Sequence, residues 1–249
     1  MPSVVKIDIS PLCNLRCTVC VHAIPNGDEA LERQFFHADQ KMSVAQYQKI
    51  IDEVRSSVSA VFLHYLGDPL MHPNLDEMSA YASQANVNTS FSTNFSYDLS
   101  DARLEKLARS GLTGVRICVD GLSQEKYQRT RINGRIDRVI SNLKRLCEIK
   151  RQYGLRHPKI EVQYLTFDYN LDELEEARRL FAEIGVDHVT TFPGWLGNYT
   201  NLNPDKFDVL GPKRKSVFPG CYVPFFSMVI KYNGDVIPVS YTHLRAHET

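Results

Sequence analysis

The chain has 249 residues, enough for one large domain or for one domain and a fragment of a second. Its hydrophobic content of 43% is ordinary for a protein with a full core. Lysine plus arginine and aspartate plus glutamate both number 29, so the formal net charge is zero and no basic field favours nucleic acid. Apolar runs are far too short to span a membrane, and no secretory signal precedes the first expected strand. We therefore expect a cytoplasmic protein with neither nucleic acid nor membrane as a partner.

Strands and helices are predicted to alternate along the chain in units of about 30 residues. The expected strands cover residues 4–9, 60–66, 87–92, 114–119, 160–166 and 186–192. The expected helices cover residues 43–54, 75–84, 100–108, 123–130, 136–152 and 171–184. This alternation is typical of parallel βα units, and six units by residue 192 are too few for a complete eight-unit barrel. The pattern favours an α/β fold with a partial (β/α)6 barrel that is open on one side.

The last quarter of the chain departs from this alternation. Residues 194–220 are rich in glycine, proline, asparagine and lysine and are predicted to be a linker. Apolar runs then flank Asn233–Gly234, a dipeptide typical of a β-hairpin. The sequence after Pro238 fits neither the hairpin nor the barrel. The expected organisation is a barrel over 1–193, a linker over 194–220, a hairpin segment over 221–238 and a non-native tail over 239–249.

Three of the six cysteines lie within eight residues, as Cys13, Cys17 and Cys20 in a C-x3-C-x2-C pattern after the first expected strand. Three thiols on so short a loop cannot all pair as disulfides. They can converge on one metal centre, because thiolate is the soft ligand that iron–sulfur clusters and zinc prefer. Three ligands leave one coordination position open for a cofactor or substrate. On the residues alone, a three-cysteine zinc site with a distant fourth ligand and a chance group of core cysteines stay as alternatives.

This cysteine pattern at the end of a first strand resembles the signature of the radical S-adenosylmethionine (SAM) superfamily. The resemblance implies that Cys13, Cys17 and Cys20 hold a 4Fe–4S cluster, and that SAM chelates the iron that lacks a thiolate. It also implies that an electron from the cluster cleaves SAM to methionine and a 5′-deoxyadenosyl radical, which abstracts a hydrogen atom from the substrate. The superfamily core is a partial (β/α)6 TIM-like barrel, in agreement with the predicted alternation.

The end of the second expected strand resembles a SAM-binding motif of the superfamily. Gly67 and Asp68 match the second half of Gly-Gly-Glu-Pro, with Leu66 in place of the first glycine and aspartate in place of glutamate. The resemblance implies that Asp68 binds the SAM amino group, as suits a carboxylate beside an ammonium. An ordinary Gly-Asp-Pro turn is the alternative.

Four further residues resemble SAM contacts. Asn94 matches a Thr-Asn-Gly motif, and Asp120 matches a Ser-x-Asp-Gly motif in which Cys118 replaces the serine. Arg131 matches an arginine that pairs with the SAM carboxylate, and Val19 occupies a position close to adenine. Turn residues at Asn94 and Asp120 and a solvated arginine are the alternatives, and Arg129 is a rival to Arg131. Cys118 is expected to be a small buried thiol.

The segment from Cys221 through the expected hairpin to Pro238 resembles the start of the SPASM or twitch extension, which binds auxiliary iron–sulfur clusters in part of the superfamily. The resemblance implies that Cys221 is a ligand of an auxiliary cluster in a longer protein. That extension normally has further cysteines directly after the proline, and none follows here. We therefore expect a truncated extension in which Cys221 has no cysteine partner.

Together these features predict a radical SAM enzyme that acts on a peptide or a small metabolite. The resemblance implies an electron donor such as flavodoxin or ferredoxin. No catalytic residue on the substrate side can be identified from the sequence. The alternatives are a non-catalytic iron–sulfur or zinc-binding protein and an inert truncated fragment of such an enzyme.

Overall fold

The computed structural model describes residues 3–18, 20, 22, 39–194 and 226–237. The predictions for Val19, for Cys221 and for the tail after Pro238 lie outside the described residues. The strands are β1 (Val4–Ile7), β2 (Ala60–Phe62), β3 (Asn88–Thr93), β4 (Gly114–Val119), β5 (Lys159–Thr166), β6 (His188–Pro193), β7 (Ser227–Ile230) and β8 (Val236–Ile237). The helices are α2 (Val44–Val54), α3 (Leu75–Gln84), α4 (Asp101–Arg109), α5 (Gln124–Thr130), α6 (Ile136–Gln152) and α7 (Leu174–Ile184), with short 3-10 helices η2 (Pro69–Met71) and η3 (Leu171–Glu173).

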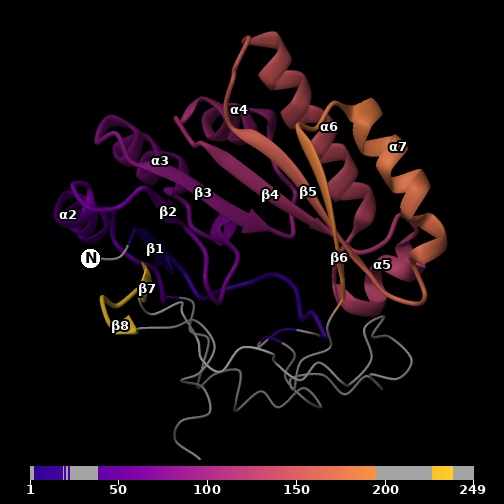
Figure 1. Ribbon diagram of the computed structural model, residues 1–249, viewed down its shortest axis with the longest axis horizontal. Coiled ribbons are helices and arrows are strands. Elements are labelled where there is room, and N and C mark those ends of the chain that lie inside the picture. The colour runs from indigo at the N-terminus through magenta and orange to yellow at the C-terminus, as the bar shows by residue number, and fades with distance from the viewer. Residues whose placement is uncertain (1–2, 19, 21, 23–38, 195–225, 238–249) are drawn as a thin grey trace, which may run out of the picture.

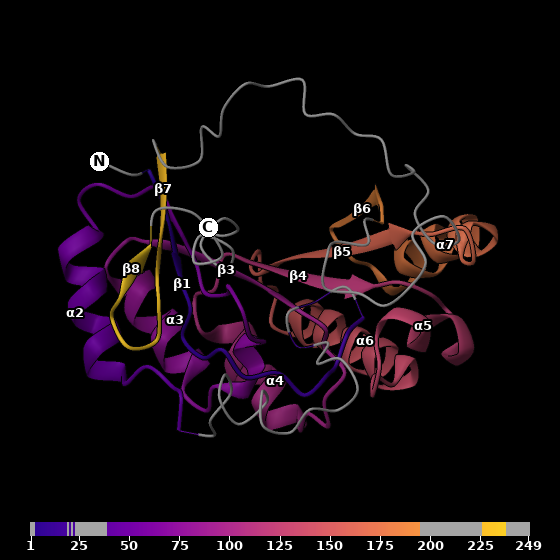
Figure 2. The ribbon, with the colours of Figure 1, turned by 90° about the horizontal axis from the view of Figure 1, so that it is seen from below.

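These strands form one eight-stranded sheet in the order β6-β5-β4-β3-β2-β1-β7-β8. Strands β1 to β6 pair with their neighbours in parallel, with helices as the connections between successive strands. Figure 1 shows the sheet with the helices packed along it, and Figure 2 shows that it curves, with the helices on its convex side. No helix of the described part of the chain covers the concave side (Figure 2). This is the open α/β partial barrel that the sequence predicts.

The side chains of the strands divide the two sides of the sheet by chemistry, because successive residues of a strand point in opposite directions. On the convex side, Val61, Phe91, Ile117 and Val162 are at most 1% exposed and pack against the helices. The concave side, which we call the inner face, carries mostly polar residues. They include Lys6, Ser90, Ser92, Arg116, Cys118, Glu161 and Gln163.

Helix starts follow the capping rules that the sequence suggests. Ser43, Ser100 and Ser123 precede α2, α4 and α5, and each side-chain oxygen accepts a hydrogen bond from the amide three residues on. The cap at Gly185, with φ of 90°, ends α7 in the left-handed region that glycine adopts without strain. These local signals explain why the predicted helices agree closely with the observed ones.

Several bounds differ from the sequence prediction. Strand β1 ends at Ile7 instead of residue 9, β6 begins at His188 instead of residue 186, and the helix expected from residue 171 begins with η3. Strand β2 ends at Phe62 instead of residue 66, because the chain then leaves the regular ladder, and the ring Nδ1 of His64 accepts a hydrogen bond from the Ser92 amide. The predicted hairpin is present, since β7 and β8 are antiparallel around Asn233–Gly234. Strand β7 also pairs in parallel with β1, however, so the hairpin extends the barrel sheet. The sequence did not predict that pairing.

Among the described residues there is no helix with the length and apolar character that crossing a membrane requires.

Candidate active site

The cysteine loop follows β1 and lies across the carboxyl ends of the central strands. On one side, the Asp68 amide donates a hydrogen bond to the Leu12 carbonyl over 2.8 Å. On the other side, the amides of Arg16 and Thr18 donate to residues at the end of α5 and just after it. In barrels of parallel strands the carboxyl ends carry the chemistry, so the fold brings the three thiols to the expected edge.

Gly67 lets the loop pass close to the end of β2. A Cβ atom at this position would lie 2.2 Å from the Ser10 carbonyl oxygen and 2.4 Å from that of Leu12. Both are backbone atoms that cannot turn away, so a residue with a side chain would displace the loop. Gly67 is therefore required by packing, whether or not it also contacts SAM.

The three cysteines of the loop are close enough for the charge of one to change the pKa of another. Burial is the main cause that raises the pKa of Cys13 to about 12, and the charges of Asp68 and of the other two cysteines add to it. Burial also raises the pKa of Cys17 to about 11, although the Arg131 guanidinium opposes the shift. Cys13 and Cys17 are thus protonated at neutral pH until a metal displaces their protons.

The donor set fits a thiolate-bound iron–sulfur cluster. Cys13, Cys17 and Cys20 are free thiols, and N–H groups lie near the sulfur atoms of Cys13 and Cys17. The Leu15 amide lies 3.4 Å and the Asn94 Nδ2 lies 3.7 Å from Cys13 Sγ. Hydrogen bonds to cluster sulfur atoms are a known means of tuning reduction potential. As placed, no three His, Cys, Asp or Glu side chains of the described residues could hold a metal ion, so the thiols would have to turn toward a shared centre.

Asp68 lies buried between the loop and the end of β3, with an exposed fraction of 4%. Its carboxylate accepts hydrogen bonds from Thr93 Oγ1, from the amide of Asn94, from Asn94 Nδ2 and from the amide of Leu70, over 2.7–3.0 Å. Burial raises the pKa of Asp68, and these bonds oppose the shift. The carboxylate is therefore already surrounded by donors, and its predicted contact with the SAM amino group stays a prediction.

Asn94 connects Asp68 to the cysteine loop. Its Nδ2 lies 2.7 Å from Asp68 Oδ2 and 2.9 Å from Asn14 Oδ1, beside Cys13. Asn14 in turn donates to the Ser96 carbonyl over 2.8 Å. Sequence reasoning missed Asn14, although its place between two of the cysteines was a usable signal.

Asp120 and Arg131 form an ion pair at the ends of β4 and α5. Arg131 Nε lies 2.6 Å from Asp120 Oδ2, and Arg131 Nη2 lies 3.2 Å from Asp120 Oδ1. The side chain of Arg131 is 13% exposed and that of Asp120 is 0% exposed. The remaining Nη1 lies 3.9 Å from Cys17 Sγ. The structure thus brings two predicted SAM contacts together beside the second cysteine, as partners of each other.

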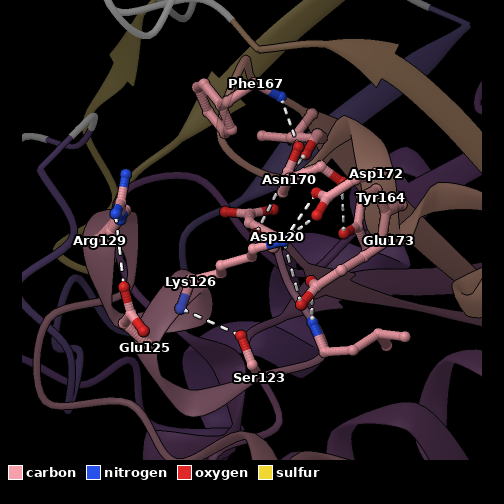
Figure 3. Close-up of polar contacts among 12 residues, drawn as sticks. Asp120, Ser123, Glu125, Lys126, Arg129, Tyr164, Phe167, Asn170, Asp172 and Glu173 are labelled. Carbon is pink, nitrogen blue, oxygen red and sulfur yellow. Dashed lines mark hydrogen bonds and ion pairs between the residues drawn. The ribbon is translucent and has the colours of Figure 1, made fainter.

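The loop after β5 supports Asp120 from the other side. Asn170 is fully buried, and its Nδ2 donates to the carbonyls of Asp120 and Leu165 over 2.8 and 2.9 Å. Figure 3 shows Asn170 next to Asp120, with Lys126 of α5 paired to Asp172 beside them. Nothing in the sequence around Asn170 indicated this role, because it depends on how the β5 loop meets the end of β4.

The other two described cysteines differ from the loop cysteines in their surroundings. Cys118 lies on the inner face, 3.2 Å from Ser92 Oγ and 3.7 Å from Gln163 Oε1. Cys147 is buried within α6, as expected of a structural thiol.

A partial barrel of parallel strands with three clustered thiols at the carboxyl ends defines a class of metal-dependent α/β enzymes. The sequence profile of the Radical SAM superfamily matches residues 7–180, which is more than half of the chain. The chain therefore belongs to the radical SAM superfamily. Enzymes of this superfamily use a 4Fe–4S cluster and SAM.

Several curated proteins are similar to the chain. A tungsten-containing aldehyde ferredoxin oxidoreductase cofactor-modifying protein of Pyrococcus furiosus is 21% identical over 262 residues, covering 93% of this chain and 69% of the relative. The mycofactocin maturase MftC of Mycolicibacterium smegmatis is 28% identical over 180 residues, covering 72% and 41%. A GTP 3′,8-cyclase of Chlorobaculum tepidum is 27% identical over 142 residues, covering 57% and 40%. The chain thus spans less than half of two of these relatives.

Solved structures show the same fold. Streptococcus suis SuiB bound to SAM superposes with a TM-score of 0.71 at 15% identity, covering 100% of this chain and 62% of SuiB. BtrN in complex with SAM and 2-DOIA superposes with a TM-score of 0.56 at 14% identity, covering 98% and 76%. At these identities the likeness establishes the architecture alone.

Proposed function

We propose that the chain carries the catalytic barrel of a radical SAM enzyme, with Cys13, Cys17 and Cys20 as the ligands of a 4Fe–4S cluster. When bound, the cluster and SAM supply a 5′-deoxyadenosyl radical that abstracts a hydrogen atom from the substrate. The observation that carries the proposal is convergence. Residues that follow β2 and β3, and residues at the end of α5, contact the cysteine loop, with Asn94 at Cys13 and Arg131 at Cys17.

The chain's own residues have positioning roles in this proposal. Asn94 and Arg131 provide N–H groups toward the sulfur atoms and hold the loop against the strand ends. Asp68, Asp120 and Gly67 are the remaining candidates for SAM contacts. Outside the described residues, Val19 is proposed to lie near adenine, and Cys221 to be a ligand of an auxiliary cluster in a longer protein.

The substrate is proposed to be a peptide or a small metabolite, and the electron donor a flavodoxin or ferredoxin. SuiB has been crystallised with its precursor peptide SuiA, and similar proteins include a GTP cyclase and a mycofactocin maturase. Both substrate classes are therefore represented among proteins of this fold or sequence.

Anaerobic reconstitution with iron and sulfide, followed by SAM and dithionite, tests the proposal. We expect about four irons per chain and release of 5′-deoxyadenosine. Cys17→Ala should abolish both, whereas Cys147→Ala, which removes a thiol distant from the loop, should keep both. A cluster without 5′-deoxyadenosine would favour a non-catalytic iron–sulfur protein, zinc in place of iron would favour a zinc protein, and no metal at all would favour an inert fragment.

A further inference from the structure

A hollow of about 130 Å³ lies on the inner face of the sheet, over the first residues of β4, β5 and β6. It is separate from the cysteine loop, which lies at the opposite ends of these strands. Its lining includes Phe62, His64, Ser92, Arg116, Glu161 and His188. One water takes about 30 Å³ in the liquid, so the hollow holds roughly four waters or one compact polar group. A folded peptide segment would not fit.

The hollow presents hydrogen-bond donors that the protein does not use. Arg116 Nε lies 3.0 Å from Glu161 Oε2, and the Nη groups of Arg116 form no hydrogen bond within the described part of the chain. Glu161 Oε1 is also engaged, because it accepts a hydrogen bond from Thr190 Oγ1 over 2.6 Å. Both carboxylate oxygens of Glu161 therefore have hydrogen-bond partners, whereas Arg116 retains N–H donors that are not used.

His64 adds a neutral donor. Its Nδ1 accepts the Ser92 amide over 3.1 Å, so the proton of the neutral ring is on Nε2. Burial and, to a lesser extent, the positive charges of Lys6 and Arg116 together lower the pKa of His64 to about 4. Phe62 packs edge-on against the ring with centroids 5.9 Å apart, which holds its orientation.

Lys6 is the third donor, after Arg116 and His64. It lies on the inner face of β1, near enough to His64 to influence its pKa, and burial lowers its own pKa. The Lys6 ammonium has no hydrogen bond or ion pair among residues 3–18, 20, 22, 39–194 and 226–237. Lys159 also borders the hollow, but its ammonium lies 3.0 Å from Asp187 and is therefore engaged. Arg116 and His64 line the hollow, and Lys6 lies beside it, because its partner in the β1–β2 register is Phe62, which is a lining residue. The hollow and its border thus present two available cations and one neutral donor, and no available anion.

We propose that this hollow binds the anionic group, a carboxylate or a phosphate, of a small substrate, with Arg116, Lys6 and His64 as the recognising residues. An exposed guanidinium and a half-buried ammonium with open donors can both form charge-assisted hydrogen bonds to an anion. The inference rests on the proposed function, since it places the far end of the substrate on the surface below the cluster. It assigns the substrate to small anionic metabolites.

Calorimetric titration of the reconstituted enzyme with inorganic phosphate and, separately, with succinate tests this inference. We expect at least one of the two anions to bind saturably. The anion that binds more tightly shows whether the hollow prefers a phosphate or a carboxylate. Arg116→Gln and Lys6→Met should each weaken binding tenfold or more. Lys159→Gln removes the same charge from the same rim but from an engaged side chain, and should change binding by less than twofold.

The imidazole ¹⁵N resonances of His64 give a second readout that needs no substitution, and they should shift on addition of the anion that binds. Failure of both anions to bind the unmodified enzyme would overturn the inference. Equal weakening by Lys159→Gln and Arg116→Gln would also overturn it, because the binding would then reflect general surface charge. These titrations contain no SAM and no reductant, so they can fail while 5′-deoxyadenosine is still formed, and the reverse also holds.

Discussion

Gly67, in the segment after β2, lies against the backbone that leads into the cysteine loop, and we predict that Gly67→Ala disrupts cluster binding. The new methyl group would overlap the carbonyls of Ser10 and Leu12, which belong to the backbone just before Cys13. Overpacking against rigid atoms typically costs about 1–3 kcal/mol, and here the strain falls on the metal loop. Iron content after reconstitution and the urea midpoint of the apoprotein should both fall. Gly114→Ala is the matched control, because the nearest atoms to its Cβ are 3.6 Å away. Equal iron content in the two variants would contradict the prediction.

The pair of Asp120 and Arg131 is almost completely buried, which decides how its variants should behave. Breaking a buried ion pair leaves an uncompensated charge and costs about 3–5 kcal/mol. We therefore expect Asp120→Asn and Arg131→Met each to destabilise the apoprotein by about 3 kcal/mol. The double variant should lose less than the sum, since neither charge is then left alone.

Denaturant unfolding of the four proteins in this cycle measures the coupling. Arg109→Met is a suitable control, because its partner Glu105 is exposed and surface pairs contribute little. Additive losses in the cycle would show that Asp120 and Arg131 act independently. In that case the 2.6 Å contact would contribute nothing measurable to the free energy of unfolding.

The positions of individual site residues could be predicted from the sequence far better than their partners. Asp68, Asn94 and Asp120 each follow a strand pattern, and parallel strands bring their carboxyl ends to one edge. Their hydrogen bonds could not be predicted, because they depend on the register of β2 against β3 and on the path of the loop. The bond from Asn94 Nδ2 to Asp68 joins residues 26 positions apart in the chain. No local pattern contains that information.

Among the contacts between elements, Asp187 joins α6 to the start of β5. It accepts from Lys150 Nζ, from Lys159 Nζ and from the amide of Ile160, over 2.7–3.0 Å. Burial alone would raise the pKa of Asp187, but these three donors outweigh it and lower the pKa from 3.8 to about 2. The connection between two secondary-structure elements therefore depends on a charged carboxylate.

We predict that Asp187→Asn destabilises the apoprotein by about 2 kcal/mol at pH 7 and by progressively less in acid. Because the folded-state pKa is depressed, the stabilisation is complete above pH 4 and is lost as the pH falls toward 2. Thermal unfolding of both proteins at pH 7 and pH 3 measures the difference. Asp172→Asn, whose partner contact is exposed, should show a smaller effect. A difference that is constant with pH would contradict the assigned cause.

Elements with a strong local signal are the ones that the sequence predicted closely. Strand β4 agrees with its predicted range, because Val115, Ile117 and Val119 alternate with residues of the inner face. Strand β2 was predicted too long, since the apolar run through Leu66 continues after the ladder has ended at Phe62. An apolar run indicates burial, and burial alone does not distinguish a strand from the irregular segment that follows it.

The complete sheet explains why the two faces have different roles. Its convex side carries the apolar core of the described residues, and its concave side carries charges and hydroxyl groups that a core would not tolerate. The pairing of β7 with β1 adds a strand to that sheet, directly beside the strand that leads into the cysteine loop. The sequence could not indicate this neighbour, because about 220 residues of chain separate Val4 from Ser227.

The position of β7 leads to a prediction about shortened chains. Val229 and Ile230 are 1% and 6% exposed, and the Asp8 amide donates to the Ile230 carbonyl over 2.8 Å. A chain that ends at Phe225 loses this strand, and burial of two such side chains contributes about 3–6 kcal/mol. Since β1 then becomes an edge strand, the loop after it should also retain less iron.

A chain that ends at Ile237 is the matched control, because it keeps β7 and β8 and lacks only Pro238 and the segment predicted to be non-native. We expect its free energy of unfolding and its iron content to equal those of the full chain. Loss of stability in this longer variant would show that the last twelve residues belong to the fold. Full stability in the shorter one would show that β1 does not need its neighbour. Only a loss confined to the chain that ends at Phe225 agrees with a hairpin that completes the barrel sheet and holds the base of the cysteine loop.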